Sequence, residues 1–280
     1  THTTAVRAGS AAKGSLLAGV SKEYVDGVSR VLELALDASS KWEVAHTDFL
    51  DPPTREAALT ALKRMADCSG IVSGGYPQAE RCRLSVGRPD VLELSGASEE
   101  ELGRGYPGAV AALEVSGNFM FDSAAHPDFL GAILNTGVVR SKVGDIVVQG
   151  ERGAQILVVP EMVDFFKGAL KTVRTVPVTV EEVPLTDLRV RPPKVDSIKT
   201  FEASLRVDAI GSAGFRMSRS KLVDMIESKQ VRVNWKEVTK SGLTVKTGDV
   251  ISIRGKGRVE VGEISETKKG RFQVELTRFV

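Results

Sequence analysis

The stretch SRSKLVDMIESKQVRVNW, residues 218–235, decides how the last third of this 280-residue chain folds. Ser218 is a good helix N-cap, and apolar residues follow it at helical spacing as far as Ile226. Val231 and Val233 then alternate with polar residues, which is typical of a half-buried strand. A capped amphipathic helix that leads directly into a strand predicts a small α+β module.

The segments on both sides extend this module. A shorter apolar helix precedes the capped one, and a turn with Gly211 and Gly214 separates the two. A tight turn at 247–249 leads into another strand, and a hairpin closes the chain. The predicted elements are helices at 205–210 and 219–228, strands at 231–234 and 250–253, and a hairpin of 259–264 with 272–276.

The outward side chains of this module are predominantly basic. Residues 199–280 hold 17 Lys and Arg against 10 Asp and Glu, a net charge of +7, whereas the rest of the chain has a net charge of −5. Arg219 and Lys221 fall in the first helical turn, where free N–H groups favour an anion and cations are unfavourable. A phosphate would resolve this conflict, although a solvated basic face without a partner would have the same composition. The charge predicts phosphate contacts from Arg219, Lys221, Lys229, Arg232, Lys236, Arg254, Lys256 and Arg258.

Two further units precede the basic module. In the first, helices are predicted from Ser21 to about Leu36 and from Thr54, and short strands at 83–86 and 91–94. The second is predicted as a strand at 109–115, a helix at 127–134, a hairpin of 146–149 with 155–159, a helix at 161–171 and a strand at 176–183. That order suits a small α+β sandwich with its helices on one face. The expected division is a flexible tail at 1–19, an α/β domain at 20–104, a central domain at 105–190, an RPPK linker at 191–194 and a C-terminal domain at 195–280.

Four short motifs in the last third carry a resemblance to a known module. They are SLRVD at 204–208, SRSK at 218–221, VRVNW at 231–235 and GDVI at 248–251. In this order they resemble the alpha-L RNA-binding module of the ribosomal protein S-four type. The resemblance implies that the RNA-binding residues also include Arg206, Ser218, Ser220 and Asn234.

The resemblance extends over most of the chain. TDFLDP at 47–52, GGYPQAER at 74–81, FLGAIL at 129–134, GDI at 144–146, SIRGKGR at 252–258 and TKKG at 267–270 are similar to the bacterial YlmH-type proteins. The photosynthetic branch of that family, the photosystem-II-associated S-four-domain proteins, is also similar. This resemblance adds Lys268 and Lys269 to the predicted RNA contacts. It implies an α+β multidomain protein with an N-terminal α/β unit, an RRM-like centre and the alpha-L module.

The expected function is non-catalytic binding of structured RNA, either rRNA or tRNA. What is known of the bacterial relatives implies a place on the large ribosomal subunit and a role in translation quality control. The photosynthetic branch implies a chloroplast stroma or a cyanobacterial cytoplasm. The acid-poor opening, residues 1–19, is compatible with the remnant of a transit peptide and with a plain tail. The alternative is a photosystem II assembly factor that acts through protein contacts.

Two features of the central unit bear on its own role. Its strands show no pair of aromatic residues suited to stacking bases, which puts an RNA role of the RRM-like part in doubt. Arg140 and Lys142, next to Gly144, are a candidate second phosphate site, with simple surface charge as the alternative.

Composition argues against several other classes of protein. No run approaches the roughly 18 apolar residues of a membrane span. Cys68 and Cys82 are too few for a disulfide framework or a four-thiolate zinc site, and the three histidines lack ligand spacing. His126 beside Asp128 has no nucleophile or second carboxylate to work with. We therefore expect a monomer without cofactor, metal or enzymatic activity, and we find no constellation for an RNA-modifying enzyme.

Overall fold

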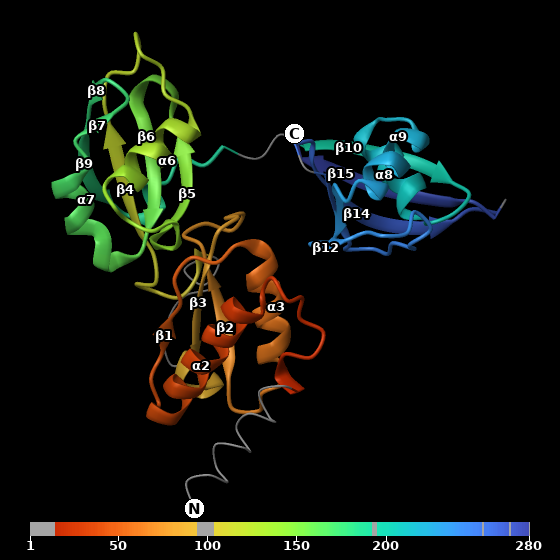
Figure 1. The fold of residues 1–280 in the computed structure, drawn as a ribbon, viewed down its shortest axis with the longest axis horizontal. Coiled ribbons are helices and arrows are strands. Elements are labelled where there is room, and N and C mark those ends of the chain that lie inside the picture. The colour runs from red at the N-terminus through yellow and green to blue at the C-terminus, as the bar shows by residue number, and fades with distance from the viewer. Residues whose placement is uncertain (1–14, 94–103, 192–194, 254, 269, 280) are drawn as a thin grey trace, which may run out of the picture. The chain divides into compact units, whose positions relative to one another are not determined.

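The computed structural model describes residues 15–93, 104–191, 195–253, 255–268 and 270–279. The chain divides into two compact units, residues 1–190 (unit 1) and 191–280 (unit 2). The last three residues of the predicted linker and the first fourteen of the predicted tail lie outside the described residues. The protein is multidomain and of the α+β class, as expected (Figure 1).

The first half of unit 1 is a three-stranded antiparallel sheet covered by two helices (Figure 1). The apolar faces of the helices pack on the strands through Val28, Leu32, Leu62 and Leu84, all buried. The strand order is β1-β3-β2. The elements are α2 (Val25–Lys41), β1 (Ala45–His46), α3 (Pro52–Leu62), β2 (Ser69–Ser73), β3 (Arg83–Gly87) and α4 (Pro89–Glu93).

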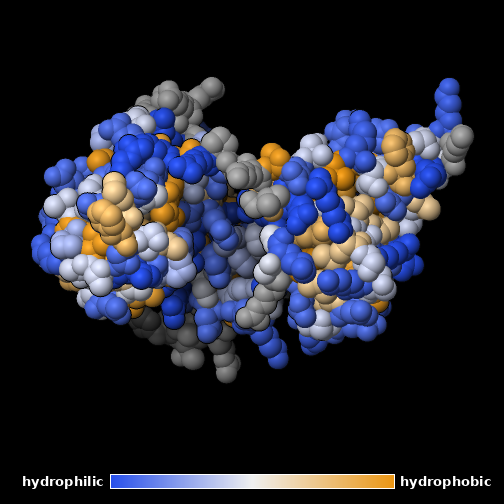
Figure 2. All heavy atoms as spheres, turned by 90° about the horizontal axis from the view of Figure 1, so that it is seen from above, coloured by the Kyte–Doolittle hydropathy of each residue, from blue (hydrophilic) through white to orange (hydrophobic). Residues whose placement is uncertain are grey.

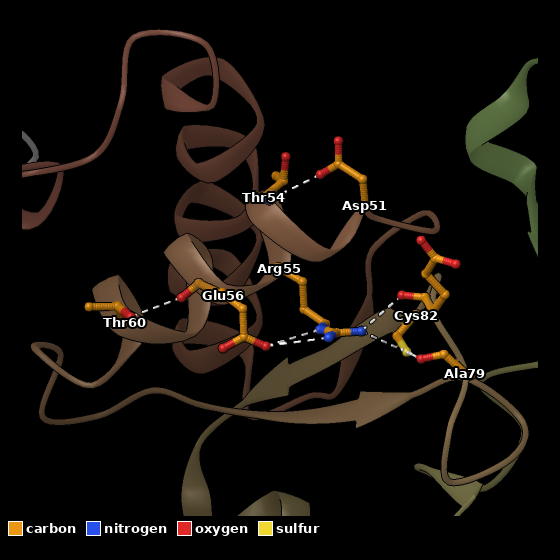
Figure 3. Close-up of polar contacts among 8 residues, drawn as sticks. Asp51, Thr54, Arg55, Glu56, Thr60, Ala79 and Cys82 are labelled. Carbon is orange, nitrogen blue, oxygen red and sulfur yellow. Dashed lines mark hydrogen bonds and ion pairs between the residues drawn. The ribbon is translucent and has the colours of Figure 1, made fainter. Parts of the chain in front are cut away.

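Three predictions for this half are wrong in detail. Residues 91–93 of the segment predicted as a strand belong instead to α4, because Pro89 at the first helical position and Asp90 in the first turn favour a helix start, and residue 94 lies outside the described residues. Helix α3 begins at Pro52, earlier than the expected start at Thr54, and its cap is Asp51, whose Oδ1 accepts the Thr54 N–H at 3.0 Å (Figure 3). The first helix begins at Val25, later than expected from Ser21, and extends to Lys41.

Arg55 joins α3 to the start of β3. Its Nη1 donates to the Glu80 carbonyl at 3.0 Å and to Cys82 Sγ at 3.1 Å, and its Nε faces the Glu56 carboxylate at 3.4 Å (Figure 3). Cys82 is a buried free thiol whose pKa is raised by burial, an effect that Arg55 opposes. The buried cysteine is therefore part of the packing between α3 and the sheet.

The second half of unit 1 has the strand-helix-strand-strand-helix-strand order that the sequence predicts. Its four strands are antiparallel in the order β5-β6-β4-β9, and α6 and α7 cover one face. Phe129 and Phe166 from the helices pack on Leu113 and Ile156 of the strands. This is an RRM-like arrangement. The elements are β4 (Ala111–Ser116), α6 (His126–Asn135), β5 (Val143–Val148), β6 (Gly153–Val158), α7 (Val163–Ala169), β9 (Thr179–Val183) and the small hairpin β7 (Thr172–Val173) with β8 (Val176–Pro177).

Unit 2 is a six-stranded antiparallel sheet with two helices packed on one face (Figure 1). The strand order is β10-β15-β14-β13-β11-β12. The elements are β10 (Val195–Glu202), α8 (Val207–Phe215), α9 (Arg219–Glu227), β11 (Val231–Val233), β12 (Lys236–Glu237), β13 (Val250–Ile253), β14 (Gly257–Glu266) and β15 (Phe272–Phe279).

The predicted turn at Gly211 and Gly214 is wrong, because both glycines lie inside α8. Their role is close packing. A Cβ on Gly211 would lie 2.7 Å from Leu222 of α9, and one on Gly214 would lie 2.7 Å from Val259 of β14. The missing side chains therefore bring α8 close to both of its neighbours.

The face of the molecule that Figure 2 shows carries both hydrophilic and hydrophobic residues. Hydrophilic residues predominate on this face, and hydrophobic residues occur in separate groups. Among the described residues, no helix combines the length and apolar character needed to cross a bilayer.

Candidate RNA-binding face

The centre of the candidate site is one buried carboxylate that holds two arginines. Asp208, in the first turn of α8, has a side chain that is only 4% exposed. Arg206 donates to it from Nε at 3.1 Å and from Nη2 at 2.9 Å, and Arg219 donates from Nη2 at 3.1 Å. Burial would raise the pKa of Asp208, but the hydrogen bonds from Arg206 and Arg219 outweigh it and hold the pKa below its ordinary value. The cluster carries a net charge of +1 and holds both guanidinium groups at the surface.

Residues 241–243, which precede β13, contact Arg206 and the start of α8. The N–H groups of Val207 and Asp208 donate to the carbonyls of Leu243 and Ser241 at 2.7 and 3.3 Å. The Arg206 guanidinium lies over Gly242, where an added Cβ would be 3.7 Å from its Cζ. Position and orientation of Arg206 are thus set by main chain as well as by Asp208.

The start of α9 presents the second arginine together with hydroxyl and ammonium groups. Ser218 is the N-cap as predicted, and its Oγ accepts the Lys221 N–H at 3.3 Å. Ser218, Arg219, Ser220 and Lys221 are all exposed. Cations here oppose the helix dipole, and Asp208 offsets this only for Arg219. The exposed helix start therefore stays the candidate site for the anion that the sequence predicts.

The β11–β12 hairpin carries the next group of predicted residues. Arg232 and Lys236 are exposed, and Lys229 is exposed while it pairs with Glu237 at 3.5 Å. Asn234 has a different role, because its amide is bound within the domain: Nδ2 donates to Asp249 at 2.8 Å and Oδ1 accepts the Val250 N–H at 2.9 Å. Asn234 shapes the turn rather than offering a free amide.

The register of the sheet separates the predicted cations into two groups. Arg232, Ser252 and Arg258 lie side by side on neighbouring strands. Their chain neighbours Val231, Ile251 and Val259 point into the core beneath α8 and α9. Since side chains alternate along a strand, Arg232 and Arg258 lie on the face away from the helices. They do not share a face with Arg219 and Lys221.

The remaining predicted residues lie in turns or beyond the described part of the chain. Lys256 and Lys268 are exposed in the turns before and after β14. The Arg258 guanidinium stacks on the Phe279 ring at 4.4 Å. Arg254 and Lys269 lie outside the described residues. The structure thus brings together Arg206, Ser218, Arg219, Ser220 and Lys221 as one compact face.

Comparison with known proteins places this geometry in a family. A Bacillus subtilis (strain 168) protein called "Ribosome-associated protein quality control protein P2" is 31% identical to this chain over 252 residues, which are 90% of this chain and 93% of the relative. Three family models match along the chain: "YlmH, N-terminal" at residues 23–91, "Putative RNA-binding domain in YlmH" at 109–187 and "S4 domain" at 205–251. The chain belongs to the YlmH family. The solved "Cell division protein ylmH from Streptococcus pneumoniae" is similar with 23% identity and a TM-score of 0.47, covering 61% of this chain and 96% of that one.

The motifs that resemble those of YlmH proteins join the two halves of unit 1. Asp145, in GDI, accepts hydrogen bonds from the Tyr76 hydroxyl at 2.7 Å and from the backbone of Glu80 and Arg81 at 2.7 and 3.0 Å. Phe49, in TDFLDP, is 2% exposed and lies against Gly144, where a Cβ would be 2.5 Å from its ring. These motifs therefore have a structural role in this YlmH protein.

The candidate phosphate site of unit 1 is part of the same junction. Lys142 pairs with Asp48 at 2.6 Å, and Arg140 donates to the carbonyls of Val143 and Gly144. Burial, with the nearby Arg81, lowers the pKa of Arg140. A phosphate would have to displace these contacts, so the structure gives both cations an intramolecular role.

The sheet face that an RRM uses for bases is covered in this YlmH protein. Leu185 and Leu188, which follow β9, pack with Phe49 on Leu157 and Ala112. We call residues 185–189 the strap. Gln155, fully buried on β6, donates to the Asp187 carbonyl at 3.0 Å and accepts the Arg189 N–H at 2.7 Å. The lack of stacking aromatics on these strands thus has a physical reason, because the face packs against protein.

Asp208 is the residue of the site whose role the sequence leaves open. Within RVD it could pair with a base or support the structure, and the structure shows that it binds Arg206 and Arg219. The sequence does contain a signal for this role. An acidic residue at the start of an apolar helix, with two arginines nearby in the chain, predicts a buried ion pair.

Proposed function

We propose that this protein is a non-catalytic RNA-binding protein that acts on the ribosome through unit 2. The observation that carries the proposal is the Arg206–Asp208–Arg219 cluster beside the exposed start of α9. One buried carboxylate fixes two guanidinium groups, so phosphate oxygens meet donors that are already oriented. Support comes from the matches to an S4 domain and to a putative RNA-binding domain, and from the name of the B. subtilis relative.

The RNA partner is proposed to be rRNA or tRNA on the large subunit, and the process to be translation quality control. Its compartment is proposed to be a chloroplast stroma or a cyanobacterial cytoplasm, on the basis of the resemblance to the photosynthetic branch. Sucrose-gradient sedimentation of the native protein at two salt concentrations, with and without ribonuclease, tests the partner. Co-migration with the large subunit that weakens with salt supports it, and a soluble profile under all conditions contradicts it.

A charge-reversal variant tests the binding face directly. Arg219→Glu with Lys221→Glu is expected to abolish most binding to large-subunit rRNA in a filter assay and to flatten its salt dependence, because about two phosphate contacts are lost. The matched control is Lys22→Glu with Lys63→Glu, two exposed lysines of unit 1 with the same change of net charge. Equal loss in both variants would show that only overall charge matters.

A further inference from the structure

Trp235 occupies a backbone position that tryptophan rarely adopts. It is the second residue of the two-residue turn between Val233 and Lys236, which pair across β11 and β12. Both turn residues have positive φ, 48° for Asn234 and 67° for Trp235, so the turn is of type I′. Asparagine tolerates positive φ. The second position of a type I′ turn favours glycine, because a bulky side chain at positive φ is strained. The turn therefore holds a large aromatic residue at a position where the backbone conformation favours glycine.

The hydrophobic core of unit 2 does not account for the ring. Trp235 is partly exposed, and among the described residues it is not one of the apolar side chains packed on the core of unit 2. Strain of this kind persists only where the surroundings impose it, and it concentrates at binding sites. The surroundings here are rigid, because Asn234 ties the turn to Asp249 and to the backbone of Val250 at 2.8 and 2.9 Å.

The charges around the turn indicate the class of ligand. Exposed cations lie on both strands of the hairpin that the turn connects, Arg232 on β11 and Lys236 on β12, and Lys229 pairs with Glu237 of the same hairpin. An aromatic ring at the end of a hairpin that carries cations suits RNA, because the flat face of a nucleobase can stack on the ring while the phosphates of the RNA backbone meet the cations. An apolar protein partner would not need these charges.

We propose that Trp235 is a base-stacking residue that receives an unpaired nucleobase of the bound RNA. This inference rests on the proposed function, RNA binding by unit 2, and makes it more specific. Bases inside a duplex are already stacked on each other, so the RNA must offer a loop, a bulge or an end at this hairpin. The RNA that unit 2 binds is therefore not a plain duplex.

The chain has two tryptophans, which makes the test direct. Trp42→Phe leaves Trp235 as the sole tryptophan of the full-length protein. The fluorescence of Trp235 in this variant is expected to be quenched on titration with purified large-subunit rRNA, with the same midpoint as in a filter-binding assay. It is expected to stay unchanged on titration with a perfectly paired RNA duplex. Quenching by the duplex to the same extent, or no quenching while rRNA binds, would overturn the inference.

Substitution of Trp235 separates binding from folding. Trp235→Gly relieves the positive-φ strain, so its melting temperature is expected to be equal to or above that of the wild type, while rRNA affinity falls about tenfold or more. Trp235→Phe is expected to retain most of the affinity. The matched control is Trp42→Gly, which removes another positive-φ tryptophan, φ 57°, from unit 1 and should leave affinity unchanged.

The outcomes distinguish the two proposals. A wild-type protein that fails to bind rRNA overturns both of them. Salt-dependent binding that is lost with the Arg219 and Lys221 reversal but retained in Trp235→Gly overturns only the stacking role.

Discussion

Asp208 holds two arginines that would otherwise repel each other at the surface of unit 2. A carboxylate that is 4% exposed is costly to bury alone, and it is stabilised here by three hydrogen bonds from Arg206 and Arg219. The same contacts fix the guanidinium groups that we propose bind phosphate. Stability and binding are thus coupled at this one residue.

Asp208→Asn is expected to destabilise unit 2 by about 2 kcal/mol, because two charge-assisted pairs are lost. The pKa of Asp208 is lowered on folding, so its contribution is present above the ordinary value of 3.8 and is lost as the pH falls through the folded-state pKa. Urea unfolding at pH 7 and pH 3 should therefore show a smaller difference in the free energy of unfolding between wild type and variant at the lower pH. Asp224→Asn, an exposed carboxylate on α9, is the control. A difference that is equal at both pH values would contradict the assignment.

At the scale of elements, the two glycines of α8 set how closely the helix packs. A Cβ on Gly214 would meet Cγ1, Cγ2 and Cβ of Val259 at 2.7, 3.1 and 3.3 Å, and a β-branched side chain has little freedom to move. A Cβ on Gly211 would meet only the flexible end of Leu222 at 2.7 Å. The two positions therefore differ in how far their neighbours can yield.

Gly214→Ala is expected to destabilise unit 2 by about 1–3 kcal/mol through overpacking, despite the better helix propensity of alanine. Gly211→Ala should lower the free energy of unfolding by less than Gly214→Ala, because the end of the Leu222 side chain can move. Gly131→Ala on α6 has no atom within 4 Å of the new Cβ and should stabilise unit 1 by about 0.5–1 kcal/mol. Thermal unfolding ranks the three variants. A stabilised Gly214→Ala would show that close packing of α8 is not limiting.

Elements with a local signal could be predicted from the sequence. The Ser218 cap and the alternation around Arg232 identify α9 and β11 without tertiary information. Strand β10 could not be found, because its apolar residues Val195, Ile198 and Phe201 recur every three positions and the strand lies at a sheet edge. The glycines of α8 read as a turn because their packing partners are distant in sequence.

The residues of the candidate site could be predicted from the sequence, but their arrangement on the surface of unit 2 could not. The basic residues and the capped helix are visible in the sequence. Their distribution over two faces depends on the register of β11, β13 and β14, which the sequence does not state. The same holds for Asn234 and Lys142, whose polar groups have partners 15 and 94 residues away.

At the scale of the whole molecule, the two compact units are expected to unfold in separate transitions. Asp145→Ala removes three hydrogen bonds that join the halves of unit 1 and should lower the stability of that unit by about 1–3 kcal/mol. Calorimetry of the full chain should show one transition shifted and the other unchanged. A shift of both would indicate that the units are energetically coupled.

The covered sheet face of unit 1 has an evolutionary consequence. An aromatic residue introduced by point mutation at Ala112 or Gln155 would meet the strap rather than solvent, so it would lower fitness through misfolding before it could stack a base. Recovery of an open platform would require the loss of the strap and of the Phe49 contact together. A point mutation on the strands therefore cannot by itself open this face to a base, because the strap and Phe49 would still cover it.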